Sequence, residues 1–225
     1  MDAERPKSEL FYTDGYEQVQ RKIMGFLNDH EEFLSGSTVN STRAVGDAIQ
    51  DILANNFESI LGEKTCKKYS AQFARRAMAD LAFEDPGGFY HVVDVKTHRL
   101  STKFNMPNLT SVDRLARFYE NDKNYFVILM VAYEIEGLRA VIHEVRFVPI
   151  EFFGWDCLTI GALGWGQIQI ANSNSININP QYPRKSWMLE MCDILMEFYP
   201  KEIAKINKRI ERFRKLKEEW QKRPG

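Results

Sequence analysis

Three charged residues in the segment 80–96 have the types and the spacing needed to hydrolyse a phosphodiester. The run Asp-Pro-Gly-Gly at 85–88 is strong turn chemistry, because proline presets φ and glycine accepts positive φ, so a hairpin is predicted around it. On the strand after the turn, period-two alternation puts Asp94 and Lys96 on one face, about 6 to 7 Å apart. Asp80, on the returning strand, can meet them across the ladder. Two carboxylates can hold a metal ion that activates water, and an ammonium can stabilise the charge that develops.

The neighbours of Asp94 and Lys96 predict that these charges are buried. Val92, Val93 and Val95 make the strand apolar on both faces, and such strands usually lie inside a sheet, where a charge must be paired or bind a metal. A solvated hairpin with alternating charge is the competing interpretation, because an acid followed two residues later by lysine is a frequent pattern.

Composition places the chain among globular proteins. Its 225 residues, 44% of them hydrophobic, can bury a sizeable core in one domain. The cysteines Cys66, Cys157 and Cys192 are widely spaced and form no Cys-x-x-Cys pair, so neither a disulfide framework nor a zinc site is indicated. No apolar run reaches the length of a membrane span and the polar start lacks a signal-peptide pattern, so we expect no membrane partner and a cytoplasmic location.

Two helices are predicted before the hairpin. Residues 1–15 have the composition of a flexible lead, and a helix should follow over 16–34. A second helix should begin at the N-cap candidates 40–42 and carries an apolar stripe at helical spacing. On its other side lie Asp47 and Asp51. Asp51 is a candidate accessory metal ligand, although a solvent-exposed carboxylate is the more common outcome.

The segments after the hairpin predict a sheet with helices around it. A polar loop at 100–109 should lead into a short helix at 110–120. Residues 125–133 are apolar throughout, as in a central buried strand, and 138–148 should pair with them across a turn at 136–137. The predicted class is therefore α/β.

Amide side chains gather later in the chain. A glycine-broken run at 161–166 precedes a predicted strand that places Gln167 and Gln169 on one face, and the Asn/Ser-rich segment 172–179 follows. Because Asn and Gln pair bidentately with adenine in the major groove, this region is a candidate for reading bases. A turn-rich surface loop is the alternative.

The C-terminal region 184–223 is predicted to be helical and basic. From Pro200 onward it holds ten Lys/Arg and four Glu, a net +6 that leaves −7 for the rest of a chain whose total is −1. Apolar residues recur at spacings of three and four, so this face should dock on something: they are Ile203, Ile206, Ile210, Phe213, Leu216 and Trp220. The basic face is a solvated surface, a phosphate-contacting arm or a dimer element.

The order of these segments resembles the PD-(D/E)xK type II restriction endonucleases, in the branch of HincII, EcoRV and SwaI. The run that starts at Val93, VDVKTHRLSTKFNMPNLTS, is similar to that family without gaps from Asp94 through Pro107 and Asn108. Together with the helix 42–53 and the helix start at Pro183, the likeness covers residues 40–215 in patches. It implies a restriction-endonuclease-like mixed β-sheet core flanked by helices, in a single nuclease domain over residues 1–225.

The resemblance also implies residue roles. Asp80 matches the first family acid, Asp94 the second and Lys96 the family lysine. In such enzymes the two carboxylates and a backbone carbonyl, here that of Val95, hold Mg²⁺, and the lysine acts on the attacking water.

The identity of the first acid stays open on the sequence alone. Ala79 stands where the family has proline, so the motif before Asp80 is incomplete. Glu84 and Asp85 are rivals for the same role, and Glu84 shares a strand face with Asp80.

DNA contacts follow from the same resemblance. Phe104 and Asn105 fall where such enzymes push side chains into the minor groove, which would bend the duplex. Gly161 stands where HincII has asparagine, so the recognised sequence should differ. The full set of expected DNA-binding residues is Lys103, Phe104, Asn105, Asn108, Gly161, Trp165, Gln167 and Gln169.

The function implied is a sequence-specific, Mg²⁺-dependent endonuclease for double-stranded DNA. It would act as a homodimer on a palindromic site, with blunt ends, beside a cognate methyltransferase. The alternatives are a repair or junction nuclease of the same fold and a non-catalytic DNA-binding protein.

Overall fold

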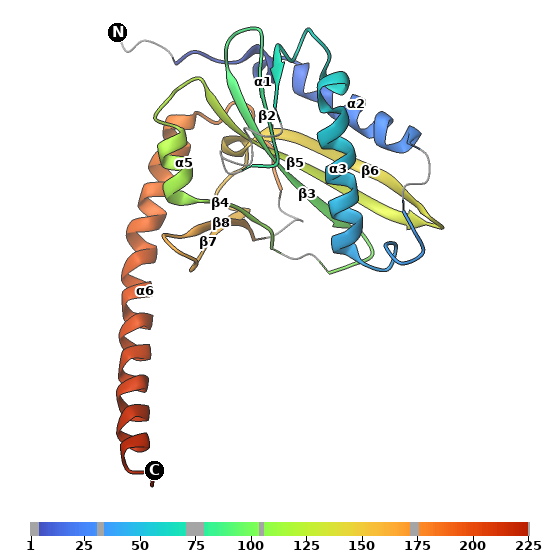
Figure 1. Cartoon of the computed structure of the whole chain (residues 1–225). Helices are drawn as coiled ribbons and strands as arrows, with labels where there is room; N and C mark the ends of the chain where they lie inside the picture. Colours follow the sequence, from blue (N-terminus) through green and yellow to red (C-terminus); the bar gives the residue numbers. More distant parts are fainter. Residues whose placement is uncertain (1–4, 31–33, 71–78, 104–105, 172–175, 225) are drawn as a thin grey trace.

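The computed structural model describes residues 5–30, 34–70, 79–103, 106–171 and 176–224. Its centre is a five-stranded sheet in the order β1-β2-β3-β5-β6 (Figure 1). β3 pairs with β5 in parallel and every other pair is antiparallel, so the sheet is mixed, as predicted. The strands are β1 (Lys68–Tyr69), β2 (Leu81–Glu84), β3 (Tyr90–Arg99), β5 (Asn124–Glu136) and β6 (Arg139–Pro149).

The two predicted hairpins are present. β2 and β3 flank the Asp-Pro-Gly-Gly turn, and β5 and β6 flank a turn in which Gly137 adopts φ +64°. That left-handed conformation favours glycine, which explains the turn at this position. β5 is buried along most of its length, in keeping with its unbroken apolar sequence.

A second, three-stranded sheet has the order β4-β8-β7. It consists of β4 (Asn108–Ser111), β7 (Leu158–Gly161) and β8 (Gln167–Ile170), and the short helix α5 (Val112–Phe118) follows β4 directly. The predicted short helix is present as α5, but it begins two residues later than expected, because residues 108–111 are extended and pair with β8. Pairing with a strand 60 residues away outweighs local propensity there.

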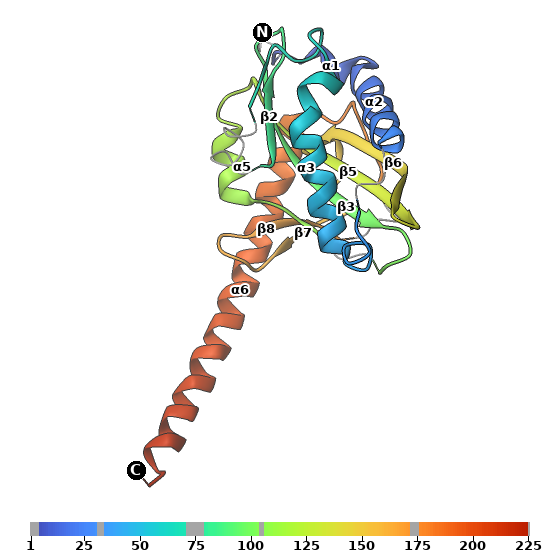
Figure 2. The ribbon, with the colours of Figure 1, turned by 45° about the vertical axis from the view of Figure 1, so that its right-hand side comes forward.

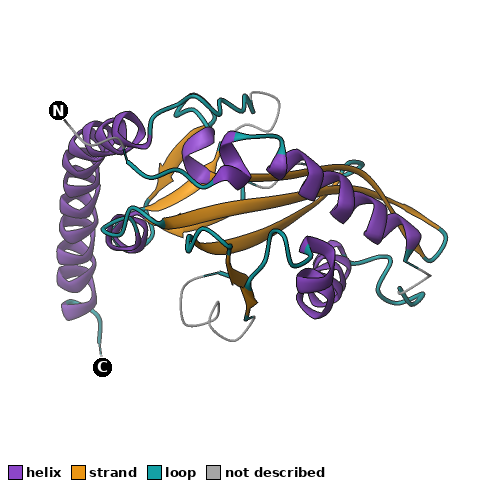
Figure 3. Cartoon of the chain, turned by 90° about the horizontal axis from the view of Figure 1, so that it is seen from above, coloured by secondary structure: helices purple, strands orange, loops and turns teal. Residues whose placement is uncertain are grey.

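Helices α2 (Gly15–Asp29) and α3 (Thr42–Leu61) pack on the larger sheet, against β6 and β3 respectively. Seen from above, the strands run through the middle of the molecule with helices around them (Figure 3). The predicted N-cap of α3 is confirmed, since the Ser41 hydroxyl accepts a hydrogen bond from the Ala44 amide. Among the described helices, none is long and apolar enough to span a membrane.

The expectation of a flexible lead was wrong for residues 5–15; residues 1–4 lie outside the described part. A short helix, α1 (Glu9–Tyr12), buries Phe11 completely against the rings of His91, Tyr125, Phe147 and Phe152. Ser8 is also buried and donates a 2.7 Å hydrogen bond to Asp85. Burying one large aromatic side chain stabilises this segment by about 2 kcal/mol, which a short polar sequence does not reveal.

A buried charged cluster fastens the C-terminal helix to the body. Glu151, in the 3₁₀ turn η1 (Ile150–Phe152), is fully buried and accepts from Arg184, the first residue of α6 (Arg184–Gln221), at 2.7 Å from Nε. Tyr119 donates to the other Glu151 oxygen at 2.6 Å. Beyond its first turns, α6 projects away from the rest of the chain (Figures 1 and 2).

Gly46 allows α3 to approach β3 closely. A Cβ at this position would lie 2.6 Å from Thr97 Oγ1, closer than any real Cβ contact. We expect Gly46→Ala to lower the free energy of unfolding by about 2 kcal/mol, although alanine is the better helix former. Gly25→Ala, in α2 with open space around it, should instead stabilise by about 0.5 kcal/mol.

Urea unfolding of both variants measures these changes. Adding Thr97→Ala to Gly46→Ala should restore most of the loss, since it removes the clashing hydroxyl. If the double variant is no more stable than Gly46→Ala alone, the close contact is not the cause.

Candidate active site

The β2–β3 hairpin places Asp80 directly beside Asp94. Leu81 pairs with Val93 across the ladder, so one further step puts Asp80 opposite Asp94. The Asp80 amide donates to the Val93 carbonyl at 3.0 Å, and Asp80 Oδ2 accepts from the Val95 amide at 2.8 Å. The first acid is therefore held at both its backbone and its side chain.

Lys96 completes the group. Its ammonium donates a 2.9 Å hydrogen bond to Asp94 Oδ1 and lies 2.8 Å from Oδ2. Asp94 is only 6% exposed, which confirms the prediction of a buried charge. Burial raises the pKa of Asp94 to about 7; the Lys96 ammonium opposes this rise, and the Asp80 carboxylate adds to it. The three groups are thus close enough to influence one another.

The raised pKa of Asp94 predicts that this carboxylate costs stability. Its folded pKa of about 7 lies above the ordinary value near 4, so the penalty grows as pH rises from about 4 to 7 and stays constant above that. We expect Asp94→Asn to raise the free energy of unfolding by about 2 kcal/mol at pH 8, and by almost nothing at pH 4, in denaturant titrations.

Asp47 offers a matched control for this pH dependence. It is an exposed aspartate on α3 whose partner Arg43 is 3.9 Å away in solvent. Asp47→Asn should change stability little, and equally at both pH values. A gain for Asp94→Asn that is the same at pH 4 and pH 8 would contradict the burial argument.

The two rivals of Asp80 lie at the other end of the hairpin. Glu84 pairs with Tyr90 across the ladder, four residues or about 13 Å from Asp80, and its carboxylate contacts Lys67 at 3.4 Å. Asp85 is buried and accepts hydrogen bonds from Ser8 and the Phe89 amide, with His91 Nε2 at 3.0 Å. Its hydrogen bonds from His91, Phe89 and Ser8 lower its pKa despite burial, so Asp85 is a structural carboxylate.

The oxygen atoms of Asp80, Asp94 and the Val95 carbonyl suit a hard divalent cation. Within the described residues, Asp94 Oδ2 accepts no hydrogen bond beyond its 2.8 Å ion pair with the Lys96 ammonium. The Val95 amide points toward Asp80, and since the N–H and C=O of one strand residue point to the same side, the Val95 carbonyl faces that side too. Mg²⁺ takes one or two carboxylates and keeps several waters, so these ligands fit it.

The structure does not bring Asp51 to this group. α3 packs on the face of β3 that carries Thr97, whereas Asp94 and Lys96 point to the opposite face. Asp51 is exposed, on the side of α3 away from its buried stripe. In the ranges that the structure describes, no three His, Cys, Asp or Glu side chains converge as a metal site, so a bound cation would complete its shell with backbone and water.

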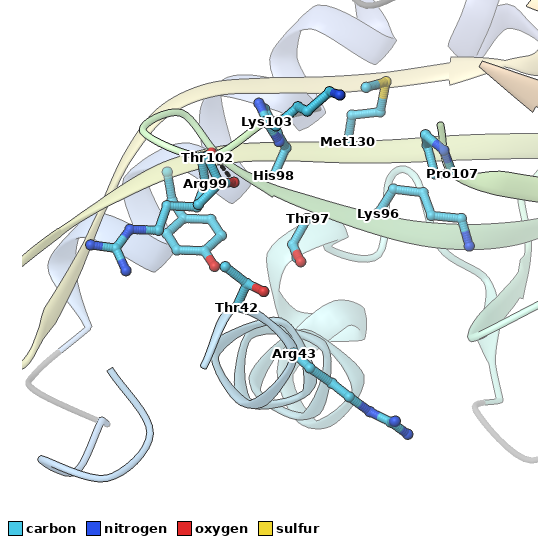
Figure 4. A pocket seen from close by; sticks show the side chains of 11 residues that line it. Thr42, Arg43, Lys96, Thr97, His98, Arg99, Thr102, Lys103, Pro107 and Met130 are labelled. Carbon is cyan, nitrogen blue, oxygen red and sulfur yellow. Dashed lines mark hydrogen bonds between the residues drawn. The ribbon is translucent and has the colours of Figure 1, made fainter. Parts of the chain in front are cut away.

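A pocket of about 220 Å³ adjoins Lys96 (Figure 4). Its lining comes from four places: the second half of β3, the β5 residues Met130 and Tyr133, the first turn of α3, and the residues Thr102, Lys103 and Pro107. Lys96, Arg43 and Lys103 bring positive charge to it. Sequence reasoning placed Lys103 near DNA but missed Arg43, for which no local signal exists, because only the packing of α3 on β3 carries it there.

Four of the expected DNA-binding residues meet in the smaller sheet. Asn108 and Gln169 are opposite each other on β4 and β8, and Gln169 Nε2 donates to Asn108 Oδ1 at 2.6 Å. Gly161 pairs with Gln167, and a Cβ at Gly161 would lie 2.7 Å from Gln169 Oε1. Gln167 and Gln169 share one face while Ile168 and Ile170 are buried, as predicted.

The other expected DNA contacts are placed differently. Trp165 is 68% exposed at the β7–β8 turn, and its carbonyl accepts a 2.7 Å hydrogen bond from Tyr199 of α6. Phe104 and Asn105 lie outside the described residues. Pro107 connects the Lys96 pocket with the smaller sheet. It lines the pocket, and its carbonyl accepts a 3.3 Å hydrogen bond from the Ile170 amide of β8.

Comparisons of the chain with protein-family models and with curated protein sequences found no match.

Proposed function

We propose that this protein is a Mg²⁺-dependent endonuclease of double-stranded DNA with a PD-(D/E)xK type of active site. The observation that carries the proposal is the convergence of Asp80, Asp94 and Lys96 at the end of one hairpin, with Asp94 buried and in contact with the Lys96 ammonium. A buried carboxylate such as Asp94, which destabilises its own fold, is more typical of a functional site than of a structural one.

Asp80, Asp94 and the Val95 carbonyl would hold the cation. When bound, Mg²⁺ supplies charge that neutralises the phosphate and acidifies water. The Val95 amide fixes the Asp80 carboxylate, so that the ligands are oriented before the substrate arrives. Lys96 favours the ionised form of Asp94, and its ammonium would orient the attacking water and stabilise the phosphate oxygens.

The surroundings of the group fit a polyanionic substrate. Arg43 and Lys103 in the adjoining pocket would contact phosphates next to the one that is cleaved, and Arg and Lys are the usual partners of the DNA backbone. The amides of Asn108, Gln167 and Gln169 would lie toward the bases. By the resemblance, the enzyme is a cytoplasmic type II restriction endonuclease, a homodimer that cuts a palindrome to blunt ends beside a cognate methyltransferase.

Digestion of a DNA of known sequence, followed by sequencing of the ends, tests this proposal. With Mg²⁺ we expect fragments that share one short palindromic sequence at their ends, and none with EDTA. Ends without a common sequence would favour a repair or junction nuclease of the same fold. Tight DNA binding without cleavage in any divalent metal would favour the non-catalytic DNA-binding protein and overturn the proposal.

A further inference from the structure

The C-terminal helix α6 carries an apolar stripe that is exposed along its whole length, although one of its residues, Tyr199, donates a hydrogen bond to the Trp165 carbonyl. The expectation that this stripe docks was not met within one molecule: in its described residues α6 buries only Arg184, Trp187 and Met191, and the rest projects away (Figure 2). We call the stripe the α6 seam. It consists of exposed residues that alternate at spacings of three and four over most of their length: Leu189, Met196, Tyr199, Ile203, Ile206, Ile210, Phe213 and Trp220.

The spacing of the seam is that of a coiled coil. Leu189, Met196, Ile203 and Ile210 stand seven residues apart in the heptad position a, and Tyr199, Ile206, Phe213 and Trp220 stand seven apart in position d. A stripe with this period packs against another helix. Phe213 is 64% exposed and Trp220 is 60% exposed, and such large patches of apolar surface are rare on a monomer.

We propose that a second copy of this chain covers the seam, as an antiparallel coiled coil of two α6 helices. When Ile203 of one copy lies beside Ile206 of the other, Met196 faces Phe213 and Leu189 faces Trp220, so these layers are apolar on both sides. The same alignment also places Tyr199 against Ile210.

The charges beside the seam favour this direction and alignment. In the antiparallel pair, Asp193 of each copy flanks Arg214 of the other, and Glu202 flanks Arg209, so four attractive contacts form. A parallel pair would instead put Arg209 beside Arg214, twice.

Lys217, which occupies a core position of the coiled coil, also favours the antiparallel arrangement. Two Lys217 side chains would face each other in a parallel coiled coil, whereas in the antiparallel one each Lys217 lies opposite Cys192 and near Asp193 of the other copy. The polar residues thus discriminate against the parallel arrangement as well as supporting the antiparallel one.

The body of each copy would add to the interface. Tyr199 bonds to Trp165 on the β7–β8 turn, where Leu163 is also exposed, so the second copy's helix would lie beside this apolar turn. The primary role of Trp165 would then be in the dimer interface and not in DNA binding. None of Asp80, Asp94 and Lys96 belongs to the seam, so the inference is independent of the proposed nuclease activity.

Sedimentation equilibrium of the full chain, read together with its circular dichroism, tests the proposal. Wild type should be a dimer at micromolar concentration, and Ile203→Asp with Ile206→Asp a monomer that keeps its fold. Asp193→Arg and Arg214→Glu should each raise the dimer Kd about tenfold, whereas the two together should return it close to the wild-type value. Lys208→Glu, on the outer side of α6, is the control and should leave Kd unchanged.

Three outcomes would overturn the proposal. The first is a wild-type chain that is monomeric at about 100 µM. The second is a tighter dimer for Arg214→Glu, which a parallel pair predicts. The third is a variant with both Ile203→Asp and Ile206→Asp that is still a dimer. A cross-link fixes the direction independently. Mild oxidation of the Lys217→Cys variant should form a disulfide between residue 217 of one copy and Cys192 of the other, and adding Cys192→Ser should prevent it. In a parallel pair, the two wild-type Cys192 residues would form a disulfide with each other.

Discussion

Replacing Lys96 with alanine is expected to lower Mg²⁺-dependent DNA cleavage by about a thousandfold, measured as the single-turnover rate on a cleavable duplex. The ammonium lies 2.9 Å from Asp94 Oδ1, where it supports ionisation of a buried carboxylate and stands ready to stabilise phosphate charge. Without it, Asp94 holds its proton more strongly and the transition state loses a cation. Asp80→Asn and Asp94→Asn should be at least as damaging, because each removes one of the two carboxylates proposed to hold Mg²⁺.

Glu84→Gln and Lys67→Ala are the matched controls for these variants. They remove the ion pair at the other end of the same hairpin, which is largely exposed. Cleavage should stay within about twofold of wild type. Cleavage by Lys96→Ala at the wild-type rate, or its loss in Glu84→Gln, would remove the assigned roles. The stabilising effect of Asp94→Asn depends only on burial and would persist even in a protein without nuclease activity.

Glu151→Ala is expected to lower the free energy of unfolding by about 4 kcal/mol, the largest stability change that we expect in this chain. The Glu151 carboxylate is fully buried and binds Arg184 at 2.6 and 2.7 Å and Tyr119 at 2.6 Å. The substitution leaves a buried guanidinium and a buried hydroxyl without their acceptor. Urea unfolding, followed by circular dichroism, measures the loss.

An equally short ion pair on the surface provides the comparison. Glu211 contacts Arg214 at 2.5 Å on the exposed part of α6, and Glu211→Ala should cost less than about 0.5 kcal/mol. Replacing Glu151 and Arg184 together by methionine should recover most of the loss, because it leaves no buried charge unpaired. A cost for Glu151→Ala as small as that for Glu211→Ala would show that the cluster does not hold α6 to the body.

Much of the larger sheet could be predicted from the sequence, because its signals are local. The Asp-Pro-Gly-Gly turn determines the β2–β3 hairpin, and alternation along β3 places Asp94 and Lys96 on one face. The valines around them predict burial, which the structure confirms for Asp94. Ser41, Gly137 and the Gln-Ile-Gln-Ile alternation of β8 are likewise readable one segment at a time.

Other features were out of reach because they depend on residues far apart in the chain. β4 forms only because β8 arrives beside it, and the first segment is ordered only because Phe11 and Ser8 find partners on β3, β6 and the hairpin turn. Arg43 reaches the Lys96 pocket through the packing of α3 at Gly46. The sequence allowed Asp51 to be a ligand, but the face on which α3 packs excludes it from the group.

The segment 80–96 shows where the two kinds of information meet. By itself, the sequence determined that Asp94 and Lys96 share a face of a buried strand, because turn chemistry and a two-residue period act within a few residues. Only the tertiary structure decided that Asp80, rather than Glu84 or Asp85, is the partner of Asp94. Register is a pairing between two strands, and a shift of a few residues along β2 would bring a different acid to the same place.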